Sequence, residues 1–165
     1  MLPEADEIIA LLQQINDVYL QTFDYSLKIK ELILNNDIEE LDKVVNSQNA
    51  LNMLSKDLEE KRQEIVRKTA ESHNIDYSQA DIDFIASLCD DEQRDKLLEL
   101  KNSLAEAIAR QISINEANAE LLCSNLNYIN FVLDITENGG TRFKTYSCSG
   151  RSSDERANGI IDTEI

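Results

Sequence analysis

The sequence predicts an all-α protein: an elongated antiparallel bundle, or coiled coil, of three long helices plus a short helix, with a flexible C-terminal tail. Two observations support this prediction. The 165 residues include only 4 Gly and 1 Pro, whereas good helix formers such as Leu, Glu and Ala abound. Apolar residues also recur at alternating steps of three and four, which is the spacing of a helical seam. We expect a helical bundle domain over residues 1–140 and the tail over residues 141–165.

The first helix is predicted over residues 4–35. Pro3 stands just before it, where the missing N–H group costs little. Asn35 and Asn36 favour the left-handed conformation that ends a helix. The alternating steps predict one buried face, made of Ile8, Leu11, Ile15, Val18, Thr22, Tyr25, Ile29 and Leu32.

The second helix is expected to follow directly. Asp37 is a good N-cap, and Glu40, three residues later, completes the pattern of a capping box. The seam is clear from Ile38 to Leu58, weakens through EEKRQ and recovers from Ile65 onward. We therefore expect the last part of this helix to be more exposed. Because the connecting turn is short, the first two helices are predicted to be antiparallel neighbours.

A short helix and a third long helix complete the predicted domain. Residues 72–78 are typical of a connection, and residues 79–88 of the short helix. Asp90 and Asp91 suit the positive N-terminal end of the third helix, and Gly139 and Gly140 are the strongest stop signal in the chain. The third seam comprises Leu97, Leu100, Leu104, Ala107, Gln111, Ile114, Asn118, Leu121, Asn125, Tyr128, Val132 and Ile135.

The charge of the chain excludes several classes of partner. There are 16 Lys and Arg against 32 Asp and Glu, giving a net charge of -16, whereas nucleic acids and anionic membrane surfaces bind basic patches. The first residues, MLPEADEII, lack the features of a signal peptide, and no run of 18 apolar residues is present. We expect a cytoplasmic protein, with Cys89, Cys123 and Cys148 as free thiols.

Enzyme chemistry is not indicated by any motif. His73 is the only histidine and falls in a predicted loop. One group of carboxylates lacks the glycine and the spacing of a calcium loop, and is better explained as helix starts: Asp81, Asp83, Asp90, Asp91 and Glu92. The sequence contains no GxGxxG, P-loop, GxSxG or HExxH pattern. We expect no catalytic activity, no cofactor and no bound metal.

Four amides occupy seam positions where leucine would be more stabilising: Gln48, Gln111, Asn118 and Asn125. They have two interpretations. Buried amides control register, because an amide that meets no polar partner is penalised. Alternatively, the seam is incompletely buried in the free protein and is covered by a ligand helix.

The aromatic end of the third helix carries more apolar surface than two neighbouring helices can bury. Its large side chains occupy more than one helical face: Tyr128, Ile129, Phe131, Val132 and Ile135. A surplus of this kind is typical of a site that binds a helix in a groove. Tyr146, the last aromatic residue, lies in the tail, where it is either a solvated side chain or an anchor for a partner's pocket.

Several of these residues together resemble the FlgN-type flagellar export chaperones. The C-terminal part of the third helix carries three matching patterns: Asn115-x-x-Asn118, Leu121-Leu122 and Leu126-x-Tyr128-Ile129-x-Phe131. The tail adds Thr145-Tyr146-Ser147-x-Ser149-Gly150 and Ile160-Ile161-Asp162, and the first two helices are also similar, so the resemblance covers nearly the whole chain. Ser147 stands where the family usually has glycine, a departure that concerns the conformation of the tail.

The resemblance implies a cytosolic chaperone for hook-associated proteins, the subunits of the hook–filament junction. Such chaperones bind the C-terminal helical region of unassembled subunits, prevent premature assembly and deliver the subunits to the cytoplasmic domain of the export gate. The family's tail tyrosine, associated with gate docking, aligns with Tyr146. The expected cargo-binding residues are Asn115, Asn118, Leu121, Leu122, Asn125, Tyr128, Ile129, Phe131 and Val132.

Two other classes of function remain open at this point. A structural coiled-coil adaptor would homodimerise through the same apolar seam. Another flagellar or virulence-secretion chaperone would follow the same physics with a different cargo.

Overall fold

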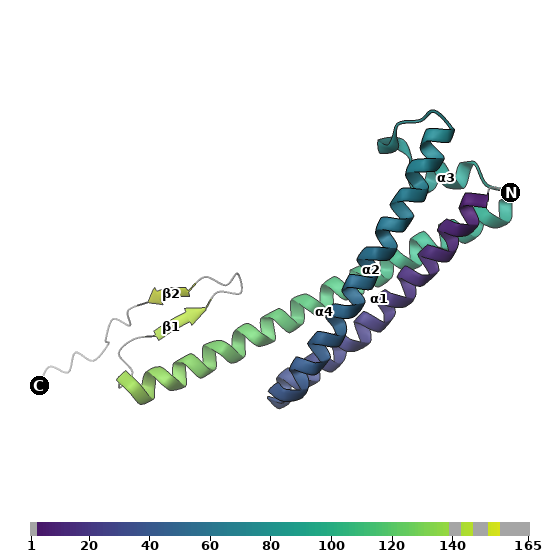
Figure 1. The fold of residues 1–165 in the computed structure, drawn as a ribbon. Helices are drawn as coiled ribbons and strands as arrows, with labels where there is room; N and C mark the ends of the chain where they lie inside the picture. Colours follow the sequence, from purple (N-terminus) through teal and green to yellow (C-terminus); the bar gives the residue numbers. More distant parts are fainter. Residues whose placement is uncertain (1–2, 139–142, 147–151, 156–165) are drawn as a thin grey trace, which may run out of the picture.

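The computed structural model describes residues 3–138, 143–146 and 152–155. Three long helices dominate it: α1 (Pro3–Asn35), α2 (Ile38–Ser72) and α4 (Asp91–Asn138). The 3-10 helix η1 (Tyr77–Gln79) and the short helix α3 (Ile82–Ser87) connect α2 to α4. The elongated all-α architecture predicted from the sequence is therefore confirmed (Figure 1).

Helix α1 is the central element, because both other long helices pack on it. The α2 helix runs antiparallel to α1, and hydrogen bonds tie Gln48 to Thr22 and Lys28 to Glu40. The α4 helix runs parallel to α1, as its polar contacts with α1 show: Gln93 with Asp6, Ser103 with Asn16 and Asn125 with Ile33. The three contacts involve Asp6, Asn16 and Ile33 in turn, so the parallel packing continues over most of the length of α1.

The turn between α1 and α2 confirms one half of the predicted capping box. Asn36 adopts a left-handed conformation, with φ of 54°, and the Asp37 carboxylate accepts a hydrogen bond from the backbone N–H of Glu40. The Glu40 side chain does not complete the box. It accepts hydrogen bonds from Lys28 at 3.1 Å and Lys43 at 3.4 Å instead, and the Asp37 N–H donates to the Leu32 carbonyl. The Glu40 carboxylate therefore binds Lys28 of α1 in place of the backbone N–H of Asp37.

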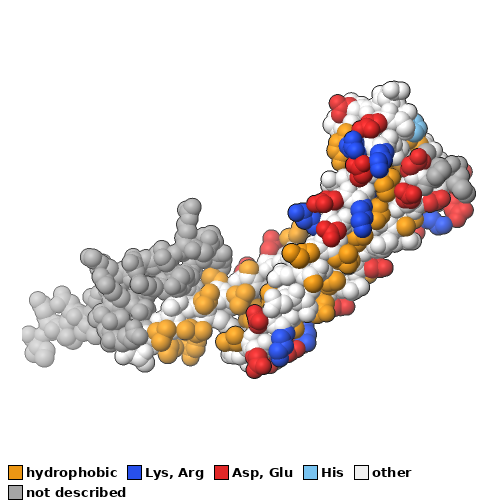
Figure 2. Space-filling view, in the orientation of Figure 1, with side chains coloured by type: hydrophobic (Ala, Val, Ile, Leu, Met, Phe, Trp, Pro, Cys, Tyr) orange, Lys and Arg blue, Asp and Glu red, His pale blue; other side chains and the backbone are white. Residues whose placement is uncertain are grey.

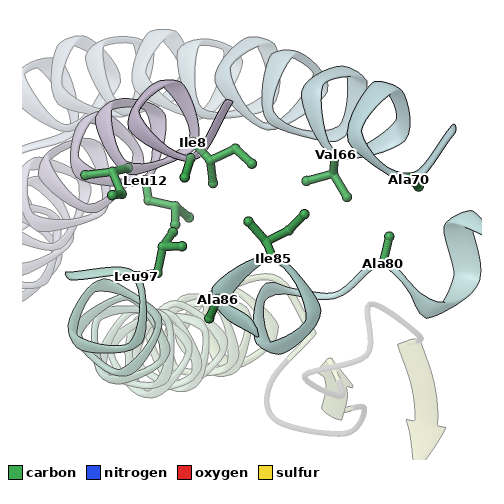
Figure 3. Close-up of a cluster of buried hydrophobic side chains, with 10 residues drawn as sticks. Ile8, Leu12, Val66, Ala70, Ala80, Ile85, Ala86 and Leu97 are labelled. Atoms are coloured by element: carbon green, nitrogen blue, oxygen red, sulfur yellow. The ribbon is translucent and has the colours of Figure 1, made fainter. Parts of the chain in front are cut away.

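The best-buried cluster of the protein lies at the end of the bundle that holds the N-terminus. Ile8 and Leu12 of α1, Val66 and Ala70 of α2, Ile85 of α3 and Leu97 of α4 converge there (Figure 3). The expectation that the last part of α2 is more exposed is thus wrong. The charged EEKRQ segment interrupts the seam, but α3 folds back over the turns that follow and buries them.

The buried face of α1 is wider than the single predicted stripe. Besides Ile8, Ile15, Val18, Thr22 and Ile29, which were predicted, α1 buries a second set: Ala5, Ile9, Leu12, Ser26 and Ile33. Contact with two helices explains the difference, because each partner requires its own stripe. Leu11, Tyr25 and Leu32 of the predicted stripe are only partly buried.

Helix α4 is longer than the helix on which it packs. It has 48 residues against 33 in α1, which correspond to about 72 Å and about 50 Å. Since both helices start at the same end of the bundle, the surplus falls at the C-terminal end of α4. Asn125 still reaches the Ile33 carbonyl, and residues 126–138 extend past the α1–α2 turn (Figure 1).

The predicted tail contributes two short strands that the sequence analysis did not anticipate. Strand β1 (Phe143–Tyr146) pairs antiparallel with β2 (Ser152–Glu155), with Phe143 opposite Glu155 and Tyr146 opposite Ser152. The β1 backbone lies beside α4. The remainder of the tail is outside the described residues.

Replacing the buried Leu97 tests the assignment of the core. Leu97 has no exposed surface and joins α4 to α1 and α3, so Leu97→Ala is expected to lower the free energy of unfolding by about 2–5 kcal/mol. Urea unfolding followed by circular dichroism measures this loss. Leu34→Ala, at a position that is 60% exposed on α1, should change the stability by less than about 1 kcal/mol; equal losses from the two variants would contradict the assignment.

Candidate protein-binding surface

The exposed apolar residues near the C-terminus of α4 form the most prominent surface feature of the protein. We call them the apolar end of α4: Leu122, Leu126, Tyr128, Ile129, Phe131, Val132, Leu133 and Ile135, all between 39% and 68% exposed. No charged residue occurs between Glu120 and Asp134. Figure 2 shows hydrophobic side chains clustered on this projecting part of the helix. Clustered exposed apolar side chains are typical of sites of interaction.

A notch separates the apolar end of α4 from the α1–α2 turn. This pocket of about 150 Å³ has Ile33, Ile38 and Leu41 on the side of the turn. Leu122, Leu126 and Ile129, at steps of four and three along α4, form the opposite side. Ile38 is 76% exposed. The apolar surface thus extends from α4 to the end of α1 and the start of α2.

A hydrogen-bonded group of amides lies further along the bundle, around the buried hydroxyl of Ser26. Ser26 Oγ accepts hydrogen bonds from Gln48 Nε2 at 2.6 Å and from Gln111 Nε2 at 2.7 Å. It donates to Asn115 Oδ1 at 3.2 Å. A small residue in the middle of α1 therefore joins α2 and α4 through their amides.

Two further amides bind the backbone of α1. Asn118 Nδ2 donates to the Ser26 carbonyl at 2.8 Å, and Asn125 Nδ2 donates to the Ile33 carbonyl at 3.3 Å. The amides at the predicted seam positions thus contact α1 within the chain, which favours the register interpretation of these residues. Gln111 Oε1 and Asn118 Oδ1 are buried and have no hydrogen-bond partner in the described part of the chain.

The structure divides the predicted cargo-binding residues into two groups. Leu122, Tyr128, Ile129, Phe131 and Val132 lie at the exposed apolar end of α4. The other four lie against α1: Asn118 is only 6% exposed, Leu121 packs against the cluster around Ile29, Asn125 is half-buried and Asn115 is exposed but hydrogen-bonded to Ser26. Their role in binding stays a prediction. The side chain of Tyr146 lies outside the described part of the structure.

Sequence reasoning missed the contribution of the α1–α2 turn. Ile38 and Leu41 were assigned to the seam of the second helix, but Ile38 projects at its first turn, where α1 ends. Leu126 and Leu133 were also left out of the predicted set. Their spacing of four and eleven residues from Leu122 on one helical face is the signal that could have identified them.

Several titratable groups in the described part of the chain have structural roles. Asp81 and Asp90 accept backbone hydrogen bonds at helix starts, from Phe84 and Gln93 respectively, as predicted. The Arg62 side chain donates two hydrogen bonds to Glu59, at 2.6 and 2.7 Å, and thereby lowers the pKa of the Glu59 carboxyl below its usual value. Burial raises the pKa of the Cys89 thiol.

His73 caps the end of α2, where its ring lies edge-on to Phe84 and its Nδ1 is 2.9 Å from the Thr69 carbonyl. Among the described residues, no group of three His, Cys, Asp or Glu side chains is placed to hold a metal ion. No helix in the same part of the chain is long and apolar enough to cross a membrane. Cys89 is a free thiol, the Cys123 sulfur accepts a hydrogen bond from Asn127, and Cys148 lies outside the described residues.

An all-α bundle that leaves an apolar helix end uncovered has the architecture of a protein-binding module. A family model, described as FlgN protein, matches residues 1–154. The chain therefore belongs to the FlgN family of flagellar export chaperones, which is a family of chaperones for flagellar proteins and not of enzymes. No curated protein and no solved structure matches the chain.

The buried amides make a prediction about stability. Asn118 has one polar end unpaired, and the Ser26 carbonyl that it contacts lies within α1. Asn118→Leu is therefore expected to raise the free energy of unfolding by about 1 kcal/mol, because it replaces an unsatisfied acceptor with apolar volume. Urea unfolding measures this change, and the dependence of the unfolding free energy on urea concentration should be the same as in the wild-type protein.

Ser26→Ala is the comparison variant. It removes the hydroxyl that is hydrogen-bonded to three amides and should lower the free energy of unfolding by about 1–3 kcal/mol. A loss of stability in Asn118→Leu would contradict the prediction.

Proposed function

We propose that this protein is a cytosolic export chaperone that binds the C-terminal helical region of the hook-associated proteins at the hook–filament junction. It prevents premature assembly of these subunits and delivers them to the export gate. The observation that supports this proposal is the exposed apolar end of α4, which starts beside the α1–α2 turn and carries no charge between Glu120 and Asp134. Membership of the FlgN family supports the class of cargo.

The physical basis is the covering of one apolar stripe by another. Subunits that assemble through coiled helices expose apolar stripes before assembly, and such a stripe fits a groove with anchors at helical spacing. Leu122, Leu126 and Ile129 supply these anchors beside the notch at the α1–α2 turn. These side chains are 42–50% exposed, so covering the rest of each contributes roughly half of the ~1.5–3 kcal/mol of full burial. Because association itself costs free energy, several anchors are needed, and they give a moderate affinity.

Delivery to the gate is assigned to the tail. Tyr146 ends strand β1, whose backbone lies beside α4. A tyrosine combines a large apolar body with a polar hydroxyl, which suits it as an anchor in a partner's pocket. This position leaves cargo contacts and gate contacts on different segments of the chain.

A homodimerising coiled-coil adaptor is the competing function, because the same apolar end could bury itself against a second copy. The net charge of -16 opposes this, since two acidic chains repel each other on approach. Light scattering of the purified protein separates the two functions: a stable dimer in the absence of cargo favours the adaptor, and a monomer favours the chaperone.

Recovery of partners from native cells tests the function directly. The tagged protein is purified from the organism's own cells, and co-purifying proteins are identified by mass spectrometry. Recovery of hook–filament junction subunits supports the proposal. Recovery of a different flagellar subunit would mean that the cargo assignment is wrong. Recovery of the chain alone would favour the adaptor.

The double substitution Leu122→Asp with Ile129→Asp tests the cargo surface. Two carboxylates placed opposite an apolar stripe would have to be desolvated on binding, so cargo affinity should fall at least about 100-fold, which corresponds to about 2.7 kcal/mol. Isothermal titration calorimetry with a purified junction subunit measures the affinity, and circular dichroism verifies that the helices persist.

The matched control for this variant is Leu20→Asp with Leu27→Asp. These exposed leucines of α1 have the same seven-residue spacing but lie away from the apolar end of α4. The control should retain cargo binding. If the variant of α4 binds as well as the control, the cargo surface lies elsewhere.

The variant Tyr146→Ala tests gate docking. Cargo binding should be nearly unchanged, because the cargo anchors lie on α4, whereas affinity for the cytoplasmic domain of the export gate should fall at least about tenfold through loss of an aromatic anchor. Surface plasmon resonance with the purified gate domain measures this affinity. Tyr77→Ala, an exposed tyrosine in η1, is the control, and an unchanged gate affinity for Tyr146→Ala would remove this residue from the docking site.

A further inference from the structure

A second groove lies between α2 and α4, nearer the N-terminal end of the bundle than the apolar end of α4. We call it the α2–α4 channel: its floor is α1, with Val18 and Thr22, and its walls are α2, with Gln48 and Asn52, and α4, with Ile108 and Asn115. Its volume is about 600 Å³. The channel exists because α2 and α4 both pack on α1.

The α4 residues that line the channel, Ile108 and Asn115 among them, belong to a longer stripe with the spacing of a helical seam. From Ile108, steps of four and three pass through Ile112, Asn115 and Ala119 to Leu122, and the same alternation continues along the apolar end of α4 to Leu133. This spacing keeps all these residues on one helical face. They are exposed or half-buried. The stripe from Ile108 to Leu133 extends over 25 residue steps, about 38 Å.

The α2 wall has the same periodicity. Leu41, Val45, Gln48, Asn52 and Ser55 follow one another at steps of four and three. The part that lines the channel, from Gln48 onward, is polar, whereas Leu41 and Val45 pack against the cluster around Ile29. Two walls at heptad spacing above a third helix leave the position that a fourth helix of a bundle occupies.

The charges around the channel specify the chemistry of such a helix. Its charged lining residues are Lys56, Glu59 and Arg62, toward its far end, and Arg62 pairs with Glu59 there. On the outer side of α4, Glu116 and Glu120 are exposed and have no ion pair among the described residues. No Lys or Arg occurs between Arg110 and the end of α4. The complementary partner is a helix with an uncharged seam and basic flanking positions.

Asn115 supplies a polar point in the middle of this stripe. Its Oδ1 already accepts hydrogen bonds from Ser26 Oγ and from Gln111 Nε2. Its Nδ2 has no hydrogen-bond partner in the described part of the chain. A helix laid over Asn115 would bury this donor, which costs free energy unless the helix supplies an acceptor.

We propose that the cargo helix fills the α2–α4 channel as the fourth helix of the bundle, in the register that places a hydrogen-bond acceptor of the cargo against Asn115 Nδ2. The site therefore includes the α2 wall, and the amide selects cargo by the position of one polar residue within an apolar stripe. This inference rests on the proposed function, because the occupant is the same C-terminal helical region of a junction subunit. It extends the site by several turns beyond the apolar end of α4.

The variant Asn52→Arg tests the α2 wall. Asn52 is exposed, makes no hydrogen bond among the described residues and lies far from the apolar end of α4. An arginine there obstructs the channel and should weaken binding of the purified C-terminal segment of a junction subunit at least about tenfold. The matched control is Asn46→Arg, an exposed amide on the same helix that does not line the channel.

The variant Asn115→Asp tests the register. It retains an oxygen acceptor for Ser26 and Gln111 but replaces the free donor with a second acceptor, so it should weaken cargo binding at least about tenfold while unfolding at a similar urea concentration. A second measurement uses cargo segments in which each polar seam residue is changed to leucine in turn. One of these should lose affinity for the wild-type protein and show little further loss with Asn115→Asp, since the two changes remove the same bond.

The outcomes separate this inference from the function on which it rests. If the wild-type protein binds no junction subunit, the proposed function fails and the inference fails with it. If wild-type protein binds and Asn52→Arg binds equally well, the channel is not the site, although the chaperone function stands. If Asn52→Arg weakens binding but Asn115→Asp does not, the helix occupies the channel without the proposed register.

Discussion

The structure depends on one constraint: α1 has to bury two faces at once. Its seam toward α2 and its seam toward α4 meet at Ser26, whose small side chain lets amides from both neighbours approach and bond to it. Because both long partners are held by α1, the space between them above α1 stays open and forms the α2–α4 channel. A larger side chain in the middle of α1 would lose the amide contacts that hold the two walls of this channel in place.

The difference in length between α4 and α1 leaves the C-terminal end of α4 uncovered by another helix. Helix α4 begins level with α1, where Gln93 bonds to Asp6, but has 15 more residues. Its end therefore has no helix to cover it, and the apolar side chains there remain in water. Clustered exposed apolar side chains normally lead a protein to associate with another molecule. The acidic charge of the body opposes association between copies, so a basic or neutral partner meets less repulsion than a second copy does.

Periodicity predicted the long helices because heptad spacing and the caps at Asp37 and Asp90 are local properties of the chain. It predicted the uncovered end for a related reason: Tyr128, Ile129 and Phe131 cannot all face one neighbour. The tertiary contacts were not accessible in this way. The spacing of a seam predicts that a position is buried but not which helix buries it. The sequence pattern therefore did not indicate that Ser26 bonds to two other helices. The apolar pattern that resumes at Ile65 likewise did not reveal that α3 covers this part of α2. Glu40 left its predicted capping box for the same reason, since Lys28 is near it only in the folded bundle.

If the proposed function holds, the protein must bind its cargo with moderate affinity, because it later releases the cargo. The division of the binding surface into an apolar part and a polar part suits this requirement. The apolar end of α4 gains free energy from every anchor that it buries. The amide-rich middle gains little net free energy, because each hydrogen bond to cargo replaces one to water, yet it penalises a helix in the wrong register. Affinity and selection are thus assigned to different turns of one helix. Because the amides Gln48, Gln111 and Asn115 are already held by Ser26 in the free protein, little side-chain entropy is lost when cargo arrives, and release requires no chemical step by this chain.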